Sequence, residues 1–408
     1  MSKMDPRFEK LYQMALDEIE NNIMPFWIEK TQDKEFGGFY GTCGDDGTPV
    51  EKASKCLILC ARLIWSFSSA YRVLKKPEYL EMAKRAYDYF VEHFVDRENG
   101  GVYYMVDYKG EPEDRKKLVY GEAFAIYAFS EYCRATGDTR ALDEALSIFE
   151  LLEKHAYDAK NKGYWELYTP QWGKMDSKES SVSHGDATTK TMNTHLHLIE
   201  AYTCLLRVWK NDRMQDKVRE HLDVMLDRIV NQEIGHYIMF LDDLWNPTSQ
   251  DVSPGHDIEG TWLMMETAEV LGEEAMVEKA KPICLKMAAA CLEEDVLPDG
   301  SMVYEVKAGE DRPLTNRSWW VQAETVVGFL NAWELSGEDR FLDASLKVME
   351  FIREHVVDHV HGEWFPMLGD DLKPVASNEQ KVSGWKAPYH NSRMCLEIIE
   401  RYRKHAKA

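Results

Sequence analysis

Residues 100–104 read Gly100-Gly101-Val102-Tyr103-Tyr104, a glycine pair followed by β-branched and aromatic side chains. Such a segment predicts a tight turn that leads into a short, twisted hairpin. Segments of the same kind recur at residues 37–40, 163–165, 235–237, 300–304 and 362–365. The spacing from one segment to the next is 62 to 72 residues, which indicates six structural repeats.

Each repeat contains two helical patterns. The pattern before each hairpin is amphipathic, with charged residues on one face, and predicts a helix that is half exposed. These helices are expected at residues 6–23, 77–95, 139–156, 213–232, 274–293 and 340–356. The pattern after each hairpin is apolar on most faces and predicts a buried helix. These helices are expected at residues 52–74, 116–136, 188–209, 256–272, 318–336 and 386–403.

Twelve helices that alternate between half exposed and buried predict an all-α fold, an (α/α)6 barrel with two concentric rings and short β-hairpins at its mouth. An open solenoid is the rival architecture. The period near 63 residues is longer than that of common solenoid repeats. The inner helices are also too apolar for an open concave face. Because we find no linker or low-complexity tract, we expect residues 1–408 to form a single domain.

The charge balance restricts the partners of the chain. Lys and Arg number 49 against 71 Asp and Glu, for a net charge of −22, which opposes binding to nucleic acid or anionic membranes. The polar start shows no signal-peptide pattern, and we expect no membrane span. The eight cysteines are scattered, as expected for free thiols in a reducing compartment. The sequence therefore predicts a cytoplasmic protein.

Polar and aromatic residues interrupt the apolar pattern of the inner helices. In an (α/α)6 barrel the hairpins and the N-terminal ends of these helices meet at one mouth, so we expect the interrupting residues to share one pocket. They are Arg62, Tyr120, Asn193, His197, His256, Glu259, Trp319, Trp320, Trp385 and His390.

The histidines have specific neighbours. Asn193 and His197 are four residues apart and share a helix face, whereas His195 points elsewhere. His256 and Glu259 also share a face, so the carboxylate could orient the imidazole and raise its basicity. His390 follows a proline that opens the last helix. Packing or capping roles are the alternatives for all three histidines.

The motifs favour sugar binding without a cofactor. Neither a His-Glu-x-x-His motif nor a glycine-rich nucleotide loop is present, so we expect no metal and no cofactor. Indole rings pack against the apolar faces of pyranose rings, with hydroxyls bound by polar groups at the rim. Trp319 and Trp320 diverge by about 100° on a helix, so they cannot form one stacking surface.

Four ordered motifs carry a family resemblance. Residues 192–202, 255–259 and 319–324 resemble the N-acylglucosamine 2-epimerase superfamily, and residues 384–393 resemble its cellobiose 2-epimerase branch. Fitting segments run from Phe36 to Arg393. Ala387 and Ser392 depart from the cysteine and glycine expected in near relatives. Both could reshape the edge of the pocket.

The resemblance implies 2-epimerisation at the reducing end of β-1,4-linked disaccharides, from cellobiose to glucosyl-mannose and from lactose to epilactose, by a monomer without a cofactor. It also implies that His256 and His390 are the acid/base pair and that His197 assists. The substrate contacts implied are Arg62, Tyr120, Asn193, Glu259, Trp319, Trp320 and Trp385.

Other functions remain open at this stage. An aldose–ketose isomerase could use the same scaffold, whereas the closing motif argues against an N-acylglucosamine epimerase. A glycoside hydrolase would need two carboxylates flanking the bond. Glu259 is one candidate for that role, with Glu122 and Glu324 as alternatives on inner helices. A sugar-binding protein without catalytic activity is the remaining alternative.

Overall fold

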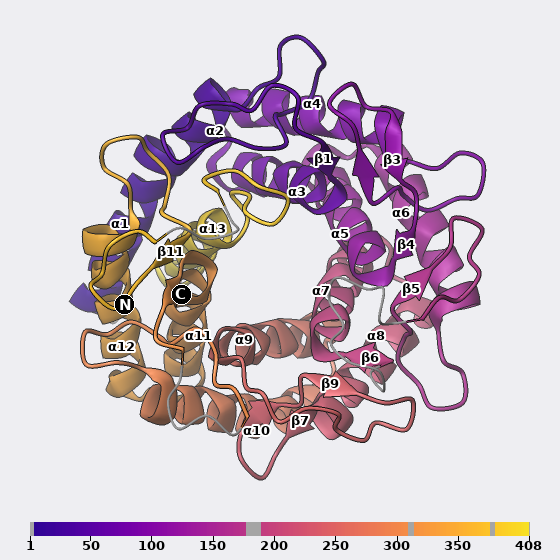
Figure 1. Cartoon of the computed structure of the whole chain (residues 1–408). Helices are drawn as coiled ribbons and strands as arrows, with labels where there is room; N and C mark the ends of the chain where they lie inside the picture. The colour runs from indigo at the N-terminus through magenta and orange to yellow at the C-terminus, as the bar shows by residue number, and fades with distance from the viewer. Residues whose placement is uncertain (1–3, 177–188, 309–313, 376–379, 408) are drawn as a thin grey trace.

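The structure is a computed structural model that describes residues 4–176, 189–308, 314–375 and 380–407. Two concentric rings of helices surround a central axis (Figure 1). The (α/α)6 barrel expected from the repeats is therefore confirmed. The first residue of the inner helix expected at 188–209 lies outside the described residues.

The inner ring contains the six buried helices. They are α3 (Leu57–Leu74), α5 (Val119–Thr136), α7 (Met192–Val208), α9 (Pro254–Leu271), α11 (Trp319–Ser336) and α13 (His390–His405). Each packs against the next along the chain, and α13 packs against α3, which closes the ring. Burial on most sides accounts for their apolar composition. The helix α3 is long and apolar enough to cross a membrane, but 83% of it is buried in the barrel.

The outer ring contains the amphipathic helices. They are α1 (Pro6–Glu18), α4 (Pro77–His93), α6 (Thr139–Leu151), α8 (Asp212–Val224), α10 (Glu274–Ala290) and α12 (Asp339–Phe351). Five of them continue into a π-helical turn, namely η1 (Ile19–Ile23), η2 (Leu152–Ala156), η4 (Met225–Ile229), η5 (Cys291–Asp295) and η6 (Ile352–Val356). After η1 the chain continues as α2 (Met24–Lys30), a helix not expected from the sequence. Pro25 is tolerated because it lies in the first turn of α2.

Each glycine segment forms a tight turn, as expected. In the second repeat, Val95 pairs with Val102 across Gly100 and Gly101, and both glycines have positive φ angles. Only the fourth turn has a regular strand pair, β7 (Val230–Asn231) with β8 (His236–Tyr237), among the described residues.

The other strand pairs connect neighbouring repeats, which the sequence did not predict. The strand before an inner helix pairs antiparallel with a strand of the following repeat. These strands are β1 (Lys55–Cys56) with β2 (Met105–Val106), β4 (Lys117–Leu118) with β5 (Leu167–Tyr168), β6 (Lys190–Thr191) with β9 (Phe240–Leu241) and β10 (Arg317–Ser318) with β11 (Met367–Leu368). A further strand, β3 (Pro112–Asp114), extends the first sheet. The pairs hold the N-terminal ends of the inner helices together at the mouth.

A buried ion pair recurs beside four of the turns. In the second repeat, the Lys117 ammonium lies 2.8 Å from Asp96, and both side chains are fully buried. Asp96 also accepts hydrogen bonds from the backbone of the turn, so it holds the turn and the start of α5 together. The equivalent pairs are Lys55–Asp33, Lys190–Asp158 and Lys381–Asp358.

A second recurring contact joins each inner helix to a turn. Glu122 of α5 accepts a hydrogen bond from the Val102 amide at 3.0 Å, and Gln322 of α11 accepts one from the Met302 amide at 2.9 Å. In α7 the equivalent contact is made by His195, whose Nε2 accepts a hydrogen bond from the Tyr164 amide at 3.0 Å. His195 therefore points away from the mouth, as expected. All eight cysteines are free and buried, which is also as expected.

Candidate active site

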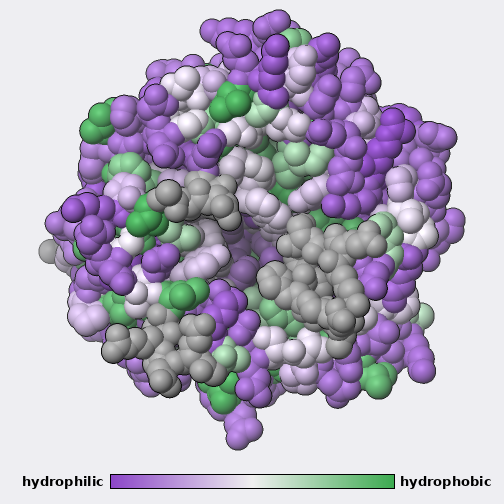
Figure 2. Space-filling model, viewed as in Figure 1, coloured by the Kyte–Doolittle hydropathy of each residue, from purple (hydrophilic) through white to green (hydrophobic). Residues whose placement is uncertain are grey.

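All ten predicted site residues line one cavity. It has a volume of about 170 Å³ and lies where the first turns of the inner helices meet. Figure 2 shows this face of the molecule, which is hollowed near its centre. Tyr304, from the fifth glycine segment, completes the described lining and was not predicted. The lining residues are Arg62, Tyr120, Asn193, His197, His256, Glu259, Tyr304, Trp319, Trp320, Trp385 and His390.

His390 is held by a carboxylate of another helix. It begins α13, and its Nδ1 lies 2.6 Å from Glu324 Oε1 of α11. Trp262 Nε1 donates to the other oxygen of Glu324 at 3.1 Å. An ionised carboxylate only accepts hydrogen bonds, so His390 carries its proton on Nδ1. Its Nε2 is then free to take up a proton.

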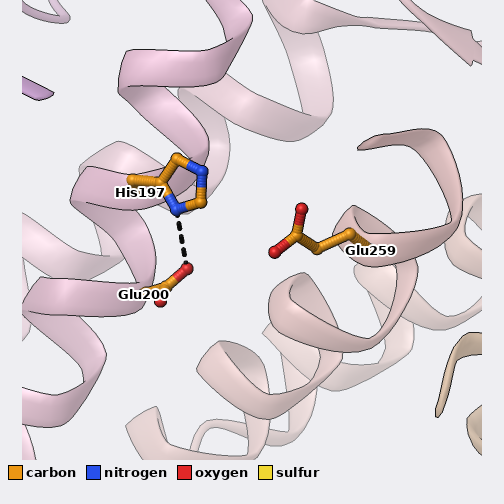
Figure 3. Close-up of side chains that lie close together, drawn as sticks. All are labelled: His197, Glu200 and Glu259. Carbon is orange, nitrogen blue, oxygen red and sulfur yellow. Dashed lines mark hydrogen bonds and ion pairs between the residues drawn. The ribbon is translucent and has the colours of Figure 1, made fainter. Parts of the chain in front are cut away.

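His197 has a similar partner on its own helix. Its Nδ1 lies 2.9 Å from Glu200 Oε2, three residues further along α7. Figure 3 shows this pair, with the carboxyl group of Glu259 turned toward it from α9. The same donor argument places the proton of His197 on Nδ1 and frees Nε2.

His256 is oriented differently from the prediction. Its Nδ1 lies 2.7 Å from the hydroxyl of Ser253, and Glu259 instead forms an ion pair with Arg393 of α13. The expectation that Glu259 orients His256 is therefore wrong. Sharing a helix face did not decide the contact, because the guanidinium attracts the carboxylate more strongly. A hydroxyl can donate or accept, so either tautomer of His256 is compatible with this bond.

Arg393 lies under the cavity and joins the carboxylates. Its Nη1 is 3.2 Å from Glu200 and its Nη2 is 2.7 Å from Glu324, and Nη2 also bonds to Glu259. Three carboxyl groups thus share one cation. Burial and the neighbouring Glu324 raise the pKa of Glu259 well above its ordinary value. Burial thus opposes the ionisation of Glu259, whereas the Arg393 guanidinium favours it.

The three cavity histidines have lowered pKa values. Burial is the largest cause that lowers the pKa of His256 to about 3, and the positive charge of Arg62 lowers it further. Burial is also the largest cause for His390, where Arg62 and Arg393 lower the pKa further. For His197 the effect of burial outweighs the opposing effect of Glu200. All three imidazoles are therefore neutral near pH 7 and can accept a proton.

Hydrogen-bond donors face the cavity from other helices. Arg62 of α3 donates to the Trp385 carbonyl at 2.7 Å and to the Tyr120 hydroxyl at 3.1 Å. The Oδ1 atom of Asn193 is buried and has no hydrogen-bond partner among the described residues. The Arg62 and Tyr120 donors can bind sugar oxygens that carry partial negative charge, and Asn193 Oδ1 can accept from a sugar hydroxyl.

The tryptophans surround the histidines. The Trp320 ring lies 4.7 Å from the His256 ring and 5.5 Å from the His390 ring, measured between centroids. Trp319 also contacts His390, at 5.5 Å, but only 1% of Trp319 is exposed. Trp320 is half-buried, so it offers more ring surface to a ligand. This difference agrees with the expected divergence of the two side chains.

Two groups of side chains have the ligand types that metals prefer. They are His197, Glu200 and Glu259, and Glu259, Glu324 and His390, with the ligand atoms of each group within 4.8 Å of one another. Arg393 already pairs with carboxylates of both groups. The guanidinium thus supplies part of the positive charge that offsets these carboxylates.

Several residues that support the site were not predicted as site residues. Arg393 and Glu200 lie within the quoted motifs, and Glu324 was considered only for hydrolysis. For Glu200 and Glu324 the signal in the sequence was a charged residue inside an otherwise apolar inner helix, whereas Arg393 lies in α13, which carries several charged residues. Ser253 and Tyr304 carried no such signal, because they lie in segments where polar residues are ordinary.

Sequence comparison identifies the family. The sequence model for N-acylglucosamine 2-epimerase (GlcNAc 2-epimerase) matches residues 38–393, which is most of the chain. The chain belongs to the N-acylglucosamine 2-epimerase family. It is accordingly an enzyme of the isomerase class.

Individual family members are similar over nearly their whole length. The cellobiose 2-epimerase of Bacteroides fragilis is 41% identical over 96% of this chain and 99% of its own. The structure of a sugar epimerase from a ruminal bacterium is 38% identical, with a TM-score of 0.91 over 96% of this chain and 99% of its own. The cellobiose 2-epimerase of Bacillus thermoamylovorans B4167 is 35% identical, with a TM-score of 0.90 over 96% of this chain and all of its own.

Proposed function

We propose that this enzyme is a cellobiose 2-epimerase, which interconverts glucose and mannose at the reducing end of β-1,4-linked disaccharides such as cellobiose and lactose. The observation that carries the proposal is one cavity lined by three neutral histidines from three different helices, together with tryptophans and hydrogen-bond donors. The high identity to cellobiose 2-epimerases supports the choice of substrate.

The reaction begins with ring opening. The proton on C2 of an aldose is acidic only when C1 is a free carbonyl, so the pyranose ring must open first. This step needs a base at the O1 hydroxyl and an acid at the ring oxygen. Glu259 lines the cavity and has a raised pKa, which suits it to donate this proton. A histidine of the cavity takes the proton from O1.

Proton transfer at C2 follows. A neutral histidine removes the C2 proton and leaves a cis-enediolate, whose negative charge develops on O1. Arg62, Tyr120 and Asn193 would bind that oxygen. Protonation from the opposite face inverts C2, so two acid/base groups are needed. We assign them to His256 of α9 and His390 of α13, with His197 assisting. One positioned acid or base contributes roughly 10²–10⁴ in rate.

The choice between epimerase, isomerase and hydrolase rests on the product. The geometry does not favour hydrolysis, because Glu259 is the single carboxyl group in the described lining of the cavity. Glu122 is hydrogen-bonded to the Val102 amide, and Glu324 is hydrogen-bonded to His390 and Arg393. An isomerase would instead move the proton from C2 to C1, and nothing in the described cavity favours that outcome.

Proton NMR of cellobiose and lactose in deuterium oxide tests the proposal. The purified protein is incubated with each sugar in the presence of a metal chelator. We expect mannose-type anomeric signals and deuterium at C2. A ketose product would identify an isomerase, and free glucose would identify a hydrolase. Loss of activity with the chelator would contradict the expected independence from metals.

Alanine variants test the roles of the histidines. We expect His256→Ala and His390→Ala each to abolish turnover while the thermal unfolding temperature and the circular dichroism spectrum stay close to those of the unaltered protein. Both side chains line the cavity, so few packing contacts are lost. Near-normal activity in both variants would contradict the assignment of the acid/base pair.

We further propose that residues 1–408 form one catalytic domain that acts as a monomer in the cytoplasm. The large exposed apolar residues are few among the described residues and lie apart from one another in the sequence. So few exposed apolar residues offer little of the apolar surface that an obligate interface buries. Light scattering coupled to gel filtration should give the mass of one chain, 47.3 kDa, and twice that mass would refute the monomer.

A further inference from the structure

A second and larger cavity lies at the opposite end of the barrel. Its volume is about 600 Å³, within the range of small-molecule sites. Side chains from the last turns of the inner helices line it, among them Arg72, Arg134, Arg207, Glu269 and Glu334. The catalytic proposal makes no use of this cavity.

Most charged groups in the wall of this cavity are paired with one another. Arg72 lies 2.6 Å from both Glu131 and Glu400. Arg207 is paired with Glu266 at 2.6 Å in the same way. A wall whose charges are mostly paired offers little attraction to a charged ligand. It does present many donors and acceptors to a neutral polar ligand.

Two buried donors in this wall have no hydrogen-bond partner among the described residues. They are the indole Nε1 of Trp65 and the amide Nδ2 of Asn331, and each residue is only 6% exposed. Both residues line the cavity. Leaving a buried donor unpaired is unfavourable, so a ligand that brings acceptor oxygens gains affinity here.

Aromatic rings complete the lining. Trp65, Tyr127 and Trp262 all line the cavity, and the rings of Trp65 and Tyr127 lie 5.2 Å apart. Aromatic rings beside balanced donors and acceptors suit a molecule with apolar ring faces and many hydroxyl groups. We propose that the far cavity is a second binding site for a neutral carbohydrate of one or two sugar units.

The far cavity also touches the supports of the active-site histidines. Glu200 lines it and accepts the hydrogen bond from His197. Trp262 lines it and donates to Glu324, which holds His390. A sugar in the far cavity therefore contacts groups that orient two histidines of the mouth cavity.

Methyl β-cellobioside is a suitable probe, because its anomeric methyl group prevents ring opening and hence epimerisation or isomerisation. The Asn193→Trp variant fills the mouth cavity, and Asn193 Oδ1 has no partner to lose. Calorimetric titration of this variant should still detect binding of the probe. Adding Trp65→Phe and Asn331→Leu should weaken that binding by roughly 2- to 13-fold for each lost hydrogen bond.

Two outcomes would overturn the second site. One is the absence of probe binding to a folded Asn193→Trp variant. The other is probe binding whose affinity stays the same when Trp65→Phe and Asn331→Leu are added. If Asn193→Trp does not fold, a crystal structure of the unaltered protein with the probe decides the question. Sugar density against Trp65 supports the site, and an empty far cavity refutes it. The probe cannot be epimerised, so failure of the epimerase proposal would leave these binding results unchanged.

Discussion

Replacing Glu324 with glutamine would test whether a carboxylate must hold His390. Glu324 Oε1 accepts from His390 at 2.6 Å and from Arg393 at 2.7 Å, and Oε2 accepts from Trp262 at 3.1 Å. Both oxygens are therefore acceptors. Glutamine has the same shape but only one acceptor oxygen, so its NH2 group must face a donor. The Glu324→Gln variant also loses the negative charge that stabilises protonated His390.

The size of the effect follows from the lost bond. A hydrogen bond to a charged group is worth about 1.5–3 kcal/mol, which corresponds to a loss in kcat of roughly 13- to 160-fold. The loss should be smaller than that of His390→Ala, because the imidazole itself remains. KM should change less than kcat, since Glu324 does not line the mouth cavity.

The assay is the initial rate of cellobiose epimerisation over a range of concentrations, with Glu122→Gln as the matched control. Glu122 is equally buried, and burial raises its pKa to about 8, so it is already largely neutral at pH 7. In α11 a natural glutamine, Gln322, makes the equivalent bond. The control should therefore keep its kcat. Equal losses in both variants, or full activity in Glu324→Gln, would refute the role given to Glu324.

Three other predictions follow from the same contacts. Ser253→Ala should lower kcat by roughly 2- to 13-fold through loss of a neutral hydrogen bond to His256. Ser253→Thr keeps the hydroxyl and should keep the rate. Equal kcat values for the two variants in steady-state kinetics would contradict this prediction. Because the lowered pKa values keep the histidines neutral in mild acid, kcat/KM should fall only below pH 6.5, and a pH profile with its acidic midpoint at or above 6.5 would be inconsistent with neutral bases. Lys117→Met should reduce the free energy of unfolding by about 3–5 kcal/mol in urea titrations, because Asp96 is left buried and unpaired, and adding Asp96→Asn should recover part of the loss if the ion pair is the cause.

Local patterns were sufficient to predict the fold and the lining of the mouth cavity. Glycine-aromatic segments mark turns wherever they occur, and helical periodicity separates the two rings. All ten predicted residues reach the cavity because most lie in the first turns of inner helices, which the barrel brings together. Tyr304 was missed because it belongs to a turn rather than to a helix.

Contacts between distant residues could not be predicted from local patterns. Arg393 binds Glu200, which is 193 positions earlier in the chain. This contact, and the one with Glu259, depend on the closed ring, because α13 packs against α11 and α3 while Glu200 and Glu259 reach Arg393 from α7 and α9. The incorrect prediction that Glu259 orients His256 has the same cause. A three-residue spacing shows that two side chains share a helix face, but it does not show which groups of other helices, such as Arg393, bind them. The π-helical turns likewise depend on packing rather than on composition.

Because the inner ring is closed, the chain could begin and end between other helices and still form this site. Tyr12 of α1 stacks on Tyr402 of α13 at 4.2 Å, so the first and last helices are neighbours (Figure 1). Around such a circle each helix keeps the same two neighbours wherever the backbone is interrupted. Gly137 joins α5 to α6 in open space, where an added Cβ would meet nothing within 4 Å. A circularly permuted chain opened at Gly137, with its natural ends linked, therefore retains every contact that forms the mouth cavity.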